Sequence, residues 1–437
     1  MKYQSTSKEY YTDLAGTVRC CYAPDRSLYM PERIPVIPRA FYNNVHEMTL
    51  KEIAYAVVTS LMGEDVNAPI IKNVVDETFT DLTFKSLGGR DEYVLELFTE
   101  NSQTFKSIGA RFMANFLSLS TDSALPRVAI ASTTGNTGIA MAEAFSKQRE
   151  RHLVVLYPKG ALQHEEALQL CSDDSMLHFV EVQGDIDKCK QMVSEASTDK
   201  RLNEQMSMVC VNTSNFLRIV PQVVLFFYAY SRLKASGTKS ERFVPVIPCG
   251  NLSMLVAAII AKRLGLPIAE IVAATNANDG FVRIINGAAI EPIANEGVRH
   301  TIARAMDTGM PTNIDRVLWL YGKDLREAST DIKAVSISDN EILRVMKEWA
   351  DKGYVADPHT AVALAAMERV AVNSSAPMVV FATSDPRCSA ALVERATGVS
   401  VDGNRIKSDC SYAKMHYSKI APTYAALKKF LINTIKK

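Results

Sequence analysis

The segment Val128-Ala129-Ile130-Ala131-Ser132-Thr133-Thr134-Gly135-Asn136-Thr137-Gly138 is followed by a helix-patterned apolar stretch at 139–145. Four apolar residues in a row, ended by hydroxyl side chains and glycine, are typical of a strand that is buried on both faces. A buried strand that turns directly into a helix is the repeating unit of a parallel sheet covered by helices.

The same pattern continues on both sides of this segment. Further buried strands are expected at 153–157, 179–182, 208–211, 243–247, 270–274 and 378–382. Helices are expected at 187–197, 216–233, 255–264 and 338–349, and the capping box Thr49-Leu50-Lys51-Glu52 opens another that runs to residue 61. Strands that alternate with helices form mainly parallel sheets. The predicted fold class is therefore α/β, with two mainly parallel three-layer α/β/α units.

A polar stretch, Gly237-Thr238-Lys239-Ser240-Glu241, separates the two series of strands and helices. We expect a mixed N-terminal extension over residues 1–90, a first α/β unit over 91–237 and a second over 238–437. Ligands of such sheets bind beyond the carboxyl ends of the strands, so the turns after the strands are the places to look for a site.

Composition excludes several classes of protein. The 437 residues are 47% apolar and 22% charged, which is typical of a globular protein. Lys plus Arg is 49 and Asp plus Glu is 48, and this balance gives no general attraction for nucleic acid or anionic lipid. The apolar run 223–230 is shorter than the roughly 18 residues of a membrane span.

The cysteines and the N-terminal residues point to the same compartment. The eight cysteines form no Cys-x-x-Cys pair and the seven histidines form no His-x-x-x-His pair, so no metal site or disulfide framework is expected. The first residues lead into polar sequence without the apolar core of a signal peptide. We expect a cytoplasmic protein with reduced thiols.

The turn at 132–138 has the chemistry of an anion-binding site. Two glycines let the backbone turn sharply, and hydroxyl groups add donors at the positive end of a helix, where a carboxylate or phosphate binds well. The turn lacks the lysine of a Walker loop and the glycine spacing of a dinucleotide fingerprint. A simple capped helix entry is the alternative interpretation.

Two cations are candidates for catalysis and binding. Lys106 lies between Phe105 and Ile108, and burial there would lower its pKa and make it a nucleophilic amine able to form a Schiff base. Arg218, just inside a predicted helix, could clamp an anionic substrate. The alternatives are a solvated lysine and a surface arginine paired with a carboxylate.

The turns at 248–253 and 382–386 are weaker signals. The first has one glycine, and the second places hydroxyl groups just after a strand. Taken alone, the first is more often an ordinary turn, and for the second a simple cap of the next helix is the favoured interpretation.

Taken in order, these segments resemble the threonine synthases, which are pyridoxal-phosphate enzymes of the tryptophan-synthase-β type. The resemblance runs from Ala23-Pro24-Asp25 to Thr383. Its pieces include Phe105-Lys106, Thr134-Gly135-Asn136-Thr137-Gly138, Tyr157-Pro158-Lys159-Gly160, Asn212, Asn215, Arg218, Gln222, Gly250-Asn251, Ala273-Ala274-Thr275-Asn276, Asn278-Asp279, Ala305-Met306-Asp307, Pro311, Asn313 and Asp357-Pro358-His359-Thr360-Ala361. The resemblance implies the two-unit architecture of fold-type II enzymes.

The resemblance also implies roles for individual residues. Lys106 would hold pyridoxal phosphate as an internal aldimine and shuttle protons, and Asn136 would bond the ring hydroxyl oxygen. Thr383 would meet the pyridine nitrogen. The cofactor phosphate would lie in a turn formed by Gly250, Asn251, Leu252 and Ser253. Residues implied in substrate binding are Thr133, Thr134 and Thr137, which would hold the carboxylate, together with Lys159, Asn215 and Arg218.

The family reaction is a carbon–oxygen lyase reaction that acts on phosphate. O-phospho-L-homoserine loses phosphate from Cγ and gains water at Cβ, which gives L-threonine. The implied partner is thus a small amino-acid substrate.

The sequence departs from the family pattern in four places. Thr99-Glu100-Asn101-Ser102 replaces His-Gly-Pro-Thr before the lysine, and the 161–168 segment lacks a basic residue and a serine. Ser253 replaces a second glycine, and Asp385-Pro386-Arg387-Cys388-Ser389 replaces His-Pro-Ala-Lys-Phe. Fewer groups that could bind a phosphorylated side chain are therefore present than in the family pattern. Arg218, Lys159 and Arg387 are the candidates that would compensate.

Three hypotheses follow from this pattern. The first is a threonine synthase that acts on O-phospho-L-homoserine. The second is a pyridoxal-phosphate lyase or deaminase of the same fold that acts on another amino acid, which the altered segments favour. The third is a non-catalytic paralogue, against which the presence of Lys106 argues.

Overall fold

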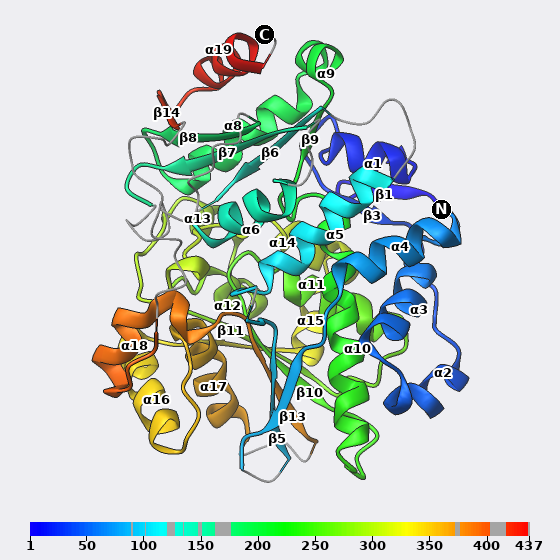
Figure 1. The fold of residues 1–437 in the computed structure, drawn as a ribbon, viewed down its shortest axis with the longest axis vertical. Coiled ribbons are helices and arrows are strands. Elements are labelled where there is room, and N and C mark those ends of the chain that lie inside the picture. Colours follow the sequence, from blue (N-terminus) through cyan, green and yellow to red (C-terminus); the bar gives the residue numbers. More distant parts are fainter. Residues whose placement is uncertain are drawn as a thin grey trace.

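The computed structural model describes residues 1–88, 91–100, 102–119, 127–133, 135–146, 151–161, 176–371, 376–402 and 417–435. Two parallel sheets dominate it, with a small antiparallel sheet near the N-terminus (Figure 1). Among the described residues, no helix is both long enough and apolar enough to cross a membrane.

The larger sheet has six strands in the order β12-β11-β10-β13-β5-β4. The bounds are β4 Thr83–Ser86, β5 Glu92–Glu96, β10 Val244–Pro248, β11 Ile271–Thr275, β12 Ile332–Ser336 and β13 Met378–Ala382. All neighbours are parallel except β4, which pairs antiparallel with β5.

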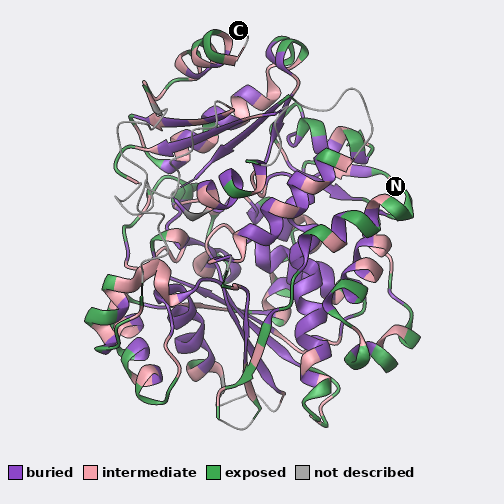
Figure 2. Ribbon diagram, viewed as in Figure 1, coloured by how far each residue is buried: buried purple, intermediate pink, exposed green. Residues whose placement is uncertain are grey.

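Helices cover both faces of the larger sheet. Successive side chains of each strand point to opposite faces, so residues of one strand pack on two different sets of helices. In β13, Val379 and Phe381 join the core that includes α10 (Val220–Ala235) and α11 (Ser253–Arg263). The alternate residues Met378 and Val380 join a core formed with α16 (Asp339–Asp351) and α17 (Pro358–Ala371). The central strands β10, β11 and β13 are buried throughout, whereas most residues of the edge strands β4 and β12 are not (Figure 2).

The smaller sheet has five parallel strands in the order β14-β8-β7-β6-β9. The bounds are β6 Val128–Ser132, β7 His152–Pro158, β8 Leu177–Val182, β9 Met208–Cys210 and β14 Tyr417–Ile420. One face packs on the core that holds α5 (Lys106–Leu119) and α6 (Asn136–Phe145), and the other packs on α8 (Ile186–Thr198) and α19 (Tyr424–Ile435). Each sheet is thus the middle of three layers.

The N-terminal residues form a mixed region that packs against the larger unit. Its antiparallel sheet has the order β2-β1-β3, and its helices include α3, which begins with the predicted capping box. Arg232 of α10 donates to the carbonyl oxygens of His46 and Met48, at 3.1 and 3.2 Å. The bounds are β1 Tyr3–Ser5, β2 Tyr11–Thr12, β3 Tyr29–Pro31, α1 Leu14–Cys20, α2 Arg39–Asn44, η1 Val45–Glu47, α3 Leu50–Met62 and α4 Ala68–Thr78.

Shorter helices complete the described chain. Their bounds are α9 Lys200–Met206, η2 Phe216–Arg218, α12 Gly280–Ile285, α13 Ile290–Ala294, η3 Arg304–Met306, α14 Ile314–Leu320, α15 Leu325–Asp331, η4 Pro386–Ser389 and α18 Ala390–Thr397.

The predicted α/β class with two mainly parallel three-layer units is confirmed, and each predicted strand is present with small shifts at its ends. Strand membership, however, crosses the predicted boundaries. β5 lies in the predicted first unit but pairs with β13 of the larger sheet, and β14 lies in the predicted second unit but pairs with β8 of the smaller sheet. Both strands join a sheet through contacts distant in sequence, which local patterns do not reveal.

The second predicted helix cap offers a test of stability. Ser338 and Glu341 form a reciprocal capping box at the start of α16, in which each side chain accepts the backbone N–H of the other. We expect Ser338→Ala to lower the free energy of unfolding by about 1 kcal/mol. Urea unfolding measures this, with Ser329→Ala inside α15 as a control that loses only a hydroxyl bond to the Arg326 carbonyl. An unchanged urea midpoint in Ser338→Ala would contradict the assignment.

Candidate functional site

A cleft of about 1200 Å³, its open mouth included, lies where the turns after several parallel strands meet. The turns after β6, β9, β10 and β13 all contribute to its lining, as does the start of α5. The residues that carry the argument below are Lys106, Thr133, Thr137, Lys190, Asn212, Arg218, Gln222, Gly250, Asn251, Leu252, Ser253, Met306, His359 and Thr383. The cleft therefore occupies the place where parallel sheets bind ligands.

Lys106 is the first residue of α5 and lines this cleft, partly buried. The end of β13 fixes the start of that helix. The Phe105 N–H donates to the Thr383 carbonyl oxygen at 3.0 Å, and Thr104 forms an isolated bridge with Ser384. Lys106 directly follows Phe105 in the chain. It is thereby held close to Thr383, on the same wall of the cleft.

The threonine-rich turn reaches the cleft from the smaller sheet. Gly135 has a φ of 145°, a backbone conformation that favours glycine. The Thr133 hydroxyl accepts the N–H groups of Gly135 and Gly138 at 3.0 and 3.2 Å and donates to the Gly135 carbonyl oxygen at 3.3 Å. Its hydroxyl thus closes the turn itself, and the role of Thr133 in holding the substrate carboxylate stays a prediction.

Three other predicted site residues belong to this turn. Thr137 lines the cleft and is half-buried. Thr134 and the side chain of Asn136 lie outside the described residues.

The turn at Gly250–Ser253 leads into the N-terminus of α11. A Cβ on Gly250 would lie 2.8 Å from the Met306 Cα, so only glycine fits there. Leu252 has a φ of 61°, an uncommon conformation for a bulky residue, and no side chain caps the helix. Strain of this kind clusters at ligand sites, and uncapped backbone N–H groups at a helix start favour an anion.

Hydrogen bonds hold the same turn from outside. Asn251 donates to the Thr213 hydroxyl at 3.1 Å and accepts the Thr312 N–H at 2.6 Å. Asn313 donates to the Asn251 carbonyl oxygen at 2.9 Å. A dianionic phosphate would fit this preorganised cradle, whose shape is fixed by neighbouring residues.

Thr383 lines the same cleft and is buried just after the end of β13. Its carbonyl oxygen is used by Phe105, but its hydroxyl has no hydrogen-bond partner among the described residues. A buried hydroxyl that faces a cleft suits a single hydrogen bond to a heterocyclic nitrogen.

Arg218 is a buried cation of the cleft, with an exposed fraction of 2%. Burial lowers its pKa to about 10, and the guanidinium donates to the Val211 carbonyl oxygen at 2.6 Å. No described carboxylate lies within ion-pair distance, and its Nε has no partner. The alternative of a surface arginine paired with a carboxylate is therefore wrong.

Two predicted substrate residues do not line the cleft. Lys159 is exposed and contributes no side chain to the lining. Asn215 is fully buried, donates to the carbonyl oxygens of Val18 and Cys210 at 2.9 and 3.1 Å, and caps the N–H of Leu217. Its side chain is directed back to α1, so it supports the fold near the cleft. The neighbouring Asn212 lines the cleft in its place.

Lys190 of α8 is a cleft residue that the sequence did not suggest. Its Nζ donates to the Thr308 hydroxyl at 2.8 Å and to Asp187 at 2.9 Å. The contact with Thr308 links the unit of the smaller sheet to a loop of the larger one. No local pattern marks such a long-range contact.

The altered segment 385–389 is bonded to Gln103, the residue that directly follows the altered segment 99–102. The Asp385 N–H donates to the Gln103 carbonyl oxygen at 2.9 Å, and the Cys388 thiol donates to the same oxygen at 3.5 Å. Arg387 donates from Nε to Asp385 Oδ1 at 2.8 Å and pairs with the second carboxylate oxygen. The Arg387 cation is thus engaged by Asp385, which corrects its expected role in phosphate binding. The 162–168 segment lies outside the described residues.

Comparisons with known proteins place this geometry in context. A family model described as pyridoxal-phosphate dependent enzyme matches residues 81–384, and a model of the threonine synthase N terminus matches residues 2–79. A threonine synthase of Buchnera aphidicola subsp. Baizongia pistaciae is 27% identical over 433 residues, which are 98% of this chain and 99% of that protein.

Two solved structures have the same architecture. Threonine synthase from Escherichia coli is 25% identical with a TM-score of 0.90, covering 99% of this chain and 100% of that one. Threonine synthase from Brucella melitensis, whose crystal structure has pyridoxal phosphate bound, is 25% identical with a TM-score of 0.87 and complete coverage of both chains.

Proposed function

Because the chain belongs to the family of pyridoxal-phosphate-dependent enzymes, we propose that its cleft holds this cofactor and that the protein is a threonine synthase. The reaction converts O-phospho-L-homoserine and water to L-threonine and phosphate. The observation that carries the proposal is the convergence of Lys106, Thr383 and the glycine turn at 250–253 on one cleft. N-terminal and central segments both match the same group of enzymes.

The residues of the cleft fit the cofactor at three points. The turn at Gly250–Ser253 holds the phosphate with backbone N–H groups at the start of α11. The Thr383 hydroxyl would bind the ring nitrogen, and Lys106 is the residue that would hold the cofactor through its aldehyde group. The Phe105 N–H donates to the Thr383 carbonyl oxygen, and Lys106 follows Phe105. The residues proposed for the two ends of the cofactor ring are therefore joined by one hydrogen bond between the end of β13 and the start of α5.

The bound cofactor supplies the electron sink that makes protons at the substrate Cα and Cβ removable. Lys106 moves these protons, because its amine is the basic group at the start of α5 that faces the cleft. Thr137 and backbone N–H groups of its turn hold the substrate carboxylate, and Asn136 contacts the ring hydroxyl. The substrate phosphate, held between the buried Arg218 and the partly buried Lys190, would be fixed as the leaving group at Cγ.

The two cations proposed for the substrate phosphate are Arg218 and Lys190. Arg218 is a guanidinium with no carboxylate partner among the described residues, and Lys190 has a third N–H donor beyond those used by Asp187 and Thr308. These two residues replace the basic groups that the sequence lacks after Lys159.

We expect Lys190→Met to raise the KM for O-phospho-L-homoserine by about tenfold or more, because one charge-assisted hydrogen bond is worth about 1.5–3 kcal/mol. Cofactor affinity should not change. Lys188→Met is the matched control, since Lys188 lies on the same helix, bonds Gln191 and does not line the cleft. Equal KM values in the two variants would remove Lys190 from the site.

The test of the function is direct. Purified protein loaded with pyridoxal phosphate is incubated with O-phospho-L-homoserine, and phosphate and L-threonine are measured together. Equal amounts of both products are expected. Holoenzyme that takes up cofactor but forms neither product would contradict the proposed activity.

A second candidate function has one observation in its favour. The altered segment 385–388 bonds to Gln103, the residue directly after the altered segment 99–102 and three before Lys106, and Glu100 interacts electrostatically with Arg387, so sequence change is concentrated near the reacting amine. A lyase or deaminase that acts on another amino acid would use the same cofactor site. A panel of serine, threonine and homoserine, followed by measurement of ammonia and keto acid, detects it. Protein that never takes up cofactor would favour a non-catalytic role.

The proposed site of action is the cytoplasm. Its support is that the cysteines at the described positions 20, 21, 189, 210 and 249 form no disulfide bond, as is usual in a reducing compartment.

A further inference from the structure

One segment of the cleft wall, residues 299–307, is held in place by several separate elements. It ends in η3, and Met306 lies so close to Gly250 that a Cβ there would meet its Cα at 2.8 Å, its O at 3.1 Å and its C at 3.3 Å. Backbone is packed directly on backbone, without a side chain between them. The position of the 299–307 segment therefore sets the position of the glycine turn.

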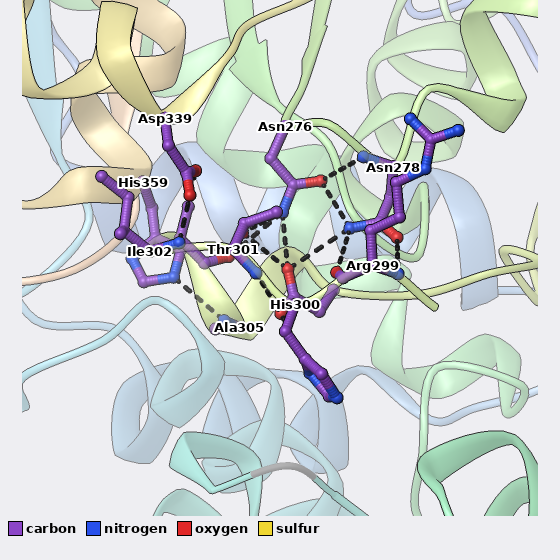
Figure 3. Close-up of polar contacts among 11 residues, drawn as sticks. Asn276, Asn278, Arg299, His300, Thr301, Ile302, Ala305, Asp339 and His359 are labelled. Atoms are coloured by element: carbon purple, nitrogen blue, oxygen red, sulfur yellow. Dashed lines mark hydrogen bonds and ion pairs between the residues drawn. The ribbon is translucent and has the colours of Figure 1, made fainter. Parts of the chain in front are cut away.

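The first anchor of the segment comes from the turn after β11. Asn276 is buried and donates to the Thr301 hydroxyl and to Asp307, both at 2.8 Å. Asp307 in turn accepts the Thr301 N–H at 3.0 Å and its hydroxyl at 2.7 Å. Asn278 accepts the Arg299 N–H at 2.8 Å (Figure 3). These bonds close the segment into a loop tied to the sheet.

The second anchor comes from the start of α17. Asp357 is 0% exposed, accepts the Thr360 N–H at 2.8 Å and accepts from His359 Nδ1 at 2.5 Å. The opposite ring nitrogen, Nε2, accepts the Ala305 N–H at 3.2 Å. Figure 3 shows His359 next to Ala305, on a different side of the segment from Asn276.

Both ring nitrogens of His359 are therefore occupied by protein. Nδ1 carries the proton given to Asp357, and Nε2 presents its lone pair to Ala305, so the ring is the neutral tautomer fixed by its partners. Although His359 lines the cleft, neither nitrogen remains to bind a ligand. Its contact with the site is indirect, through Ala305 and Met306.

We propose that His359 is a positioning residue for the cofactor phosphate. Oriented by Asp357, it holds the 299–307 segment against Gly250 and so fixes the backbone N–H groups that receive the phosphate. This inference rests on the proposed function. It gives a role to Asn276, Asp307 and the Asp357–His359 pair. The proposed reaction alone assigns no role to these residues.

Two substitutions at His359 separate this role from others. His359→Gln keeps an acceptor within reach of the Ala305 N–H, because its Oε1 replaces Nε2. His359→Asn keeps an amide near Asp357 but is too short to reach Ala305. Thr301→Val, of equal size, loosens the same segment at the other anchor.

The experiment titrates each apoprotein with pyridoxal phosphate and with pyridoxal, which lacks the phosphate, and follows the binding spectroscopically. We expect His359→Asn and Thr301→Val to weaken pyridoxal phosphate binding about tenfold, with no change for pyridoxal. His359→Gln should bind both ligands like the original protein.

Each other result has a definite meaning. Equal weakening for both ligands, or no weakening in His359→Asn and Thr301→Val, would overturn the positioning role. Failure of one variant to fold leaves the decision to the other, because they act at separate anchors. Unaltered protein that binds neither ligand would contradict the proposed function itself, and this outcome is visible before any variant is compared.

Discussion

Lys106→Ala should abolish activity. We expect phosphate release from O-phospho-L-homoserine to fall by about a thousandfold or more, because the variant loses both the covalent hold on the cofactor and the group that moves protons. The visible absorbance band of lysine-bound cofactor should disappear. Thermal unfolding of the apoprotein should change little, since the lysine is only partly buried.

The matched control is Lys72→Ala. Lys72 is an exposed lysine of α4 that pairs with Asp76 on the same helix, far from the cleft lining. This variant should keep full activity and the absorbance band. Lys106→Ala protein that retains the band and turns over substrate would show that another amine does the chemistry.

Gly250→Ala should have the second largest effect. The added Cβ would lie 2.8 Å from the Met306 Cα, a distance that real Cβ atoms do not tolerate, and the opposing atoms belong to backbone that cannot rotate away. Either the glycine turn or η3 must shift. Overpacking of this kind costs about 1–3 kcal/mol, which corresponds to roughly five- to 150-fold weaker binding of pyridoxal phosphate.

Gly237→Ala provides the comparison for that effect. Gly237 follows α10, has a φ of 83° and has open space around it, so its substitution strains the backbone without touching the cleft. Its cofactor affinity should equal that of the original protein even if its stability falls. Equal cofactor affinity in Gly250→Ala would show that the turn at 250–253 is not the phosphate cradle.

Much of the fold could be predicted from the sequence, because buried parallel strands are continuous apolar runs. Val128–Ala131 and Met378–Ala382 are such runs, and both are strands. β12 was missed, since only its first residue, Ile332, is buried and its pattern is mixed. β14 was missed because it adds to the edge of the smaller sheet through a pairing with β8 that no local pattern encodes.

The residues of the site also fall into two groups, those that local sequence marks and those that it does not. Thr383 and Gly250, which follow strand ends, and Lys106, which begins α5, could be found because motif order and turn chemistry mark them. Asn215 was assigned to the substrate, but a buried amide beside a cleft has two directions in which to point, and local sequence does not choose between them. Lys190 and the His359–Ala305 contact depend on segments that meet only after folding.

The most direct test of the central claim is chemical. Holoenzyme is reduced with borohydride, which makes the bond between lysine and cofactor permanent, and then digested and examined by mass spectrometry. The account predicts a pyridoxyl group on the peptide that contains Lys106. The same group on another lysine, such as Lys190, or on no peptide at all, would contradict it.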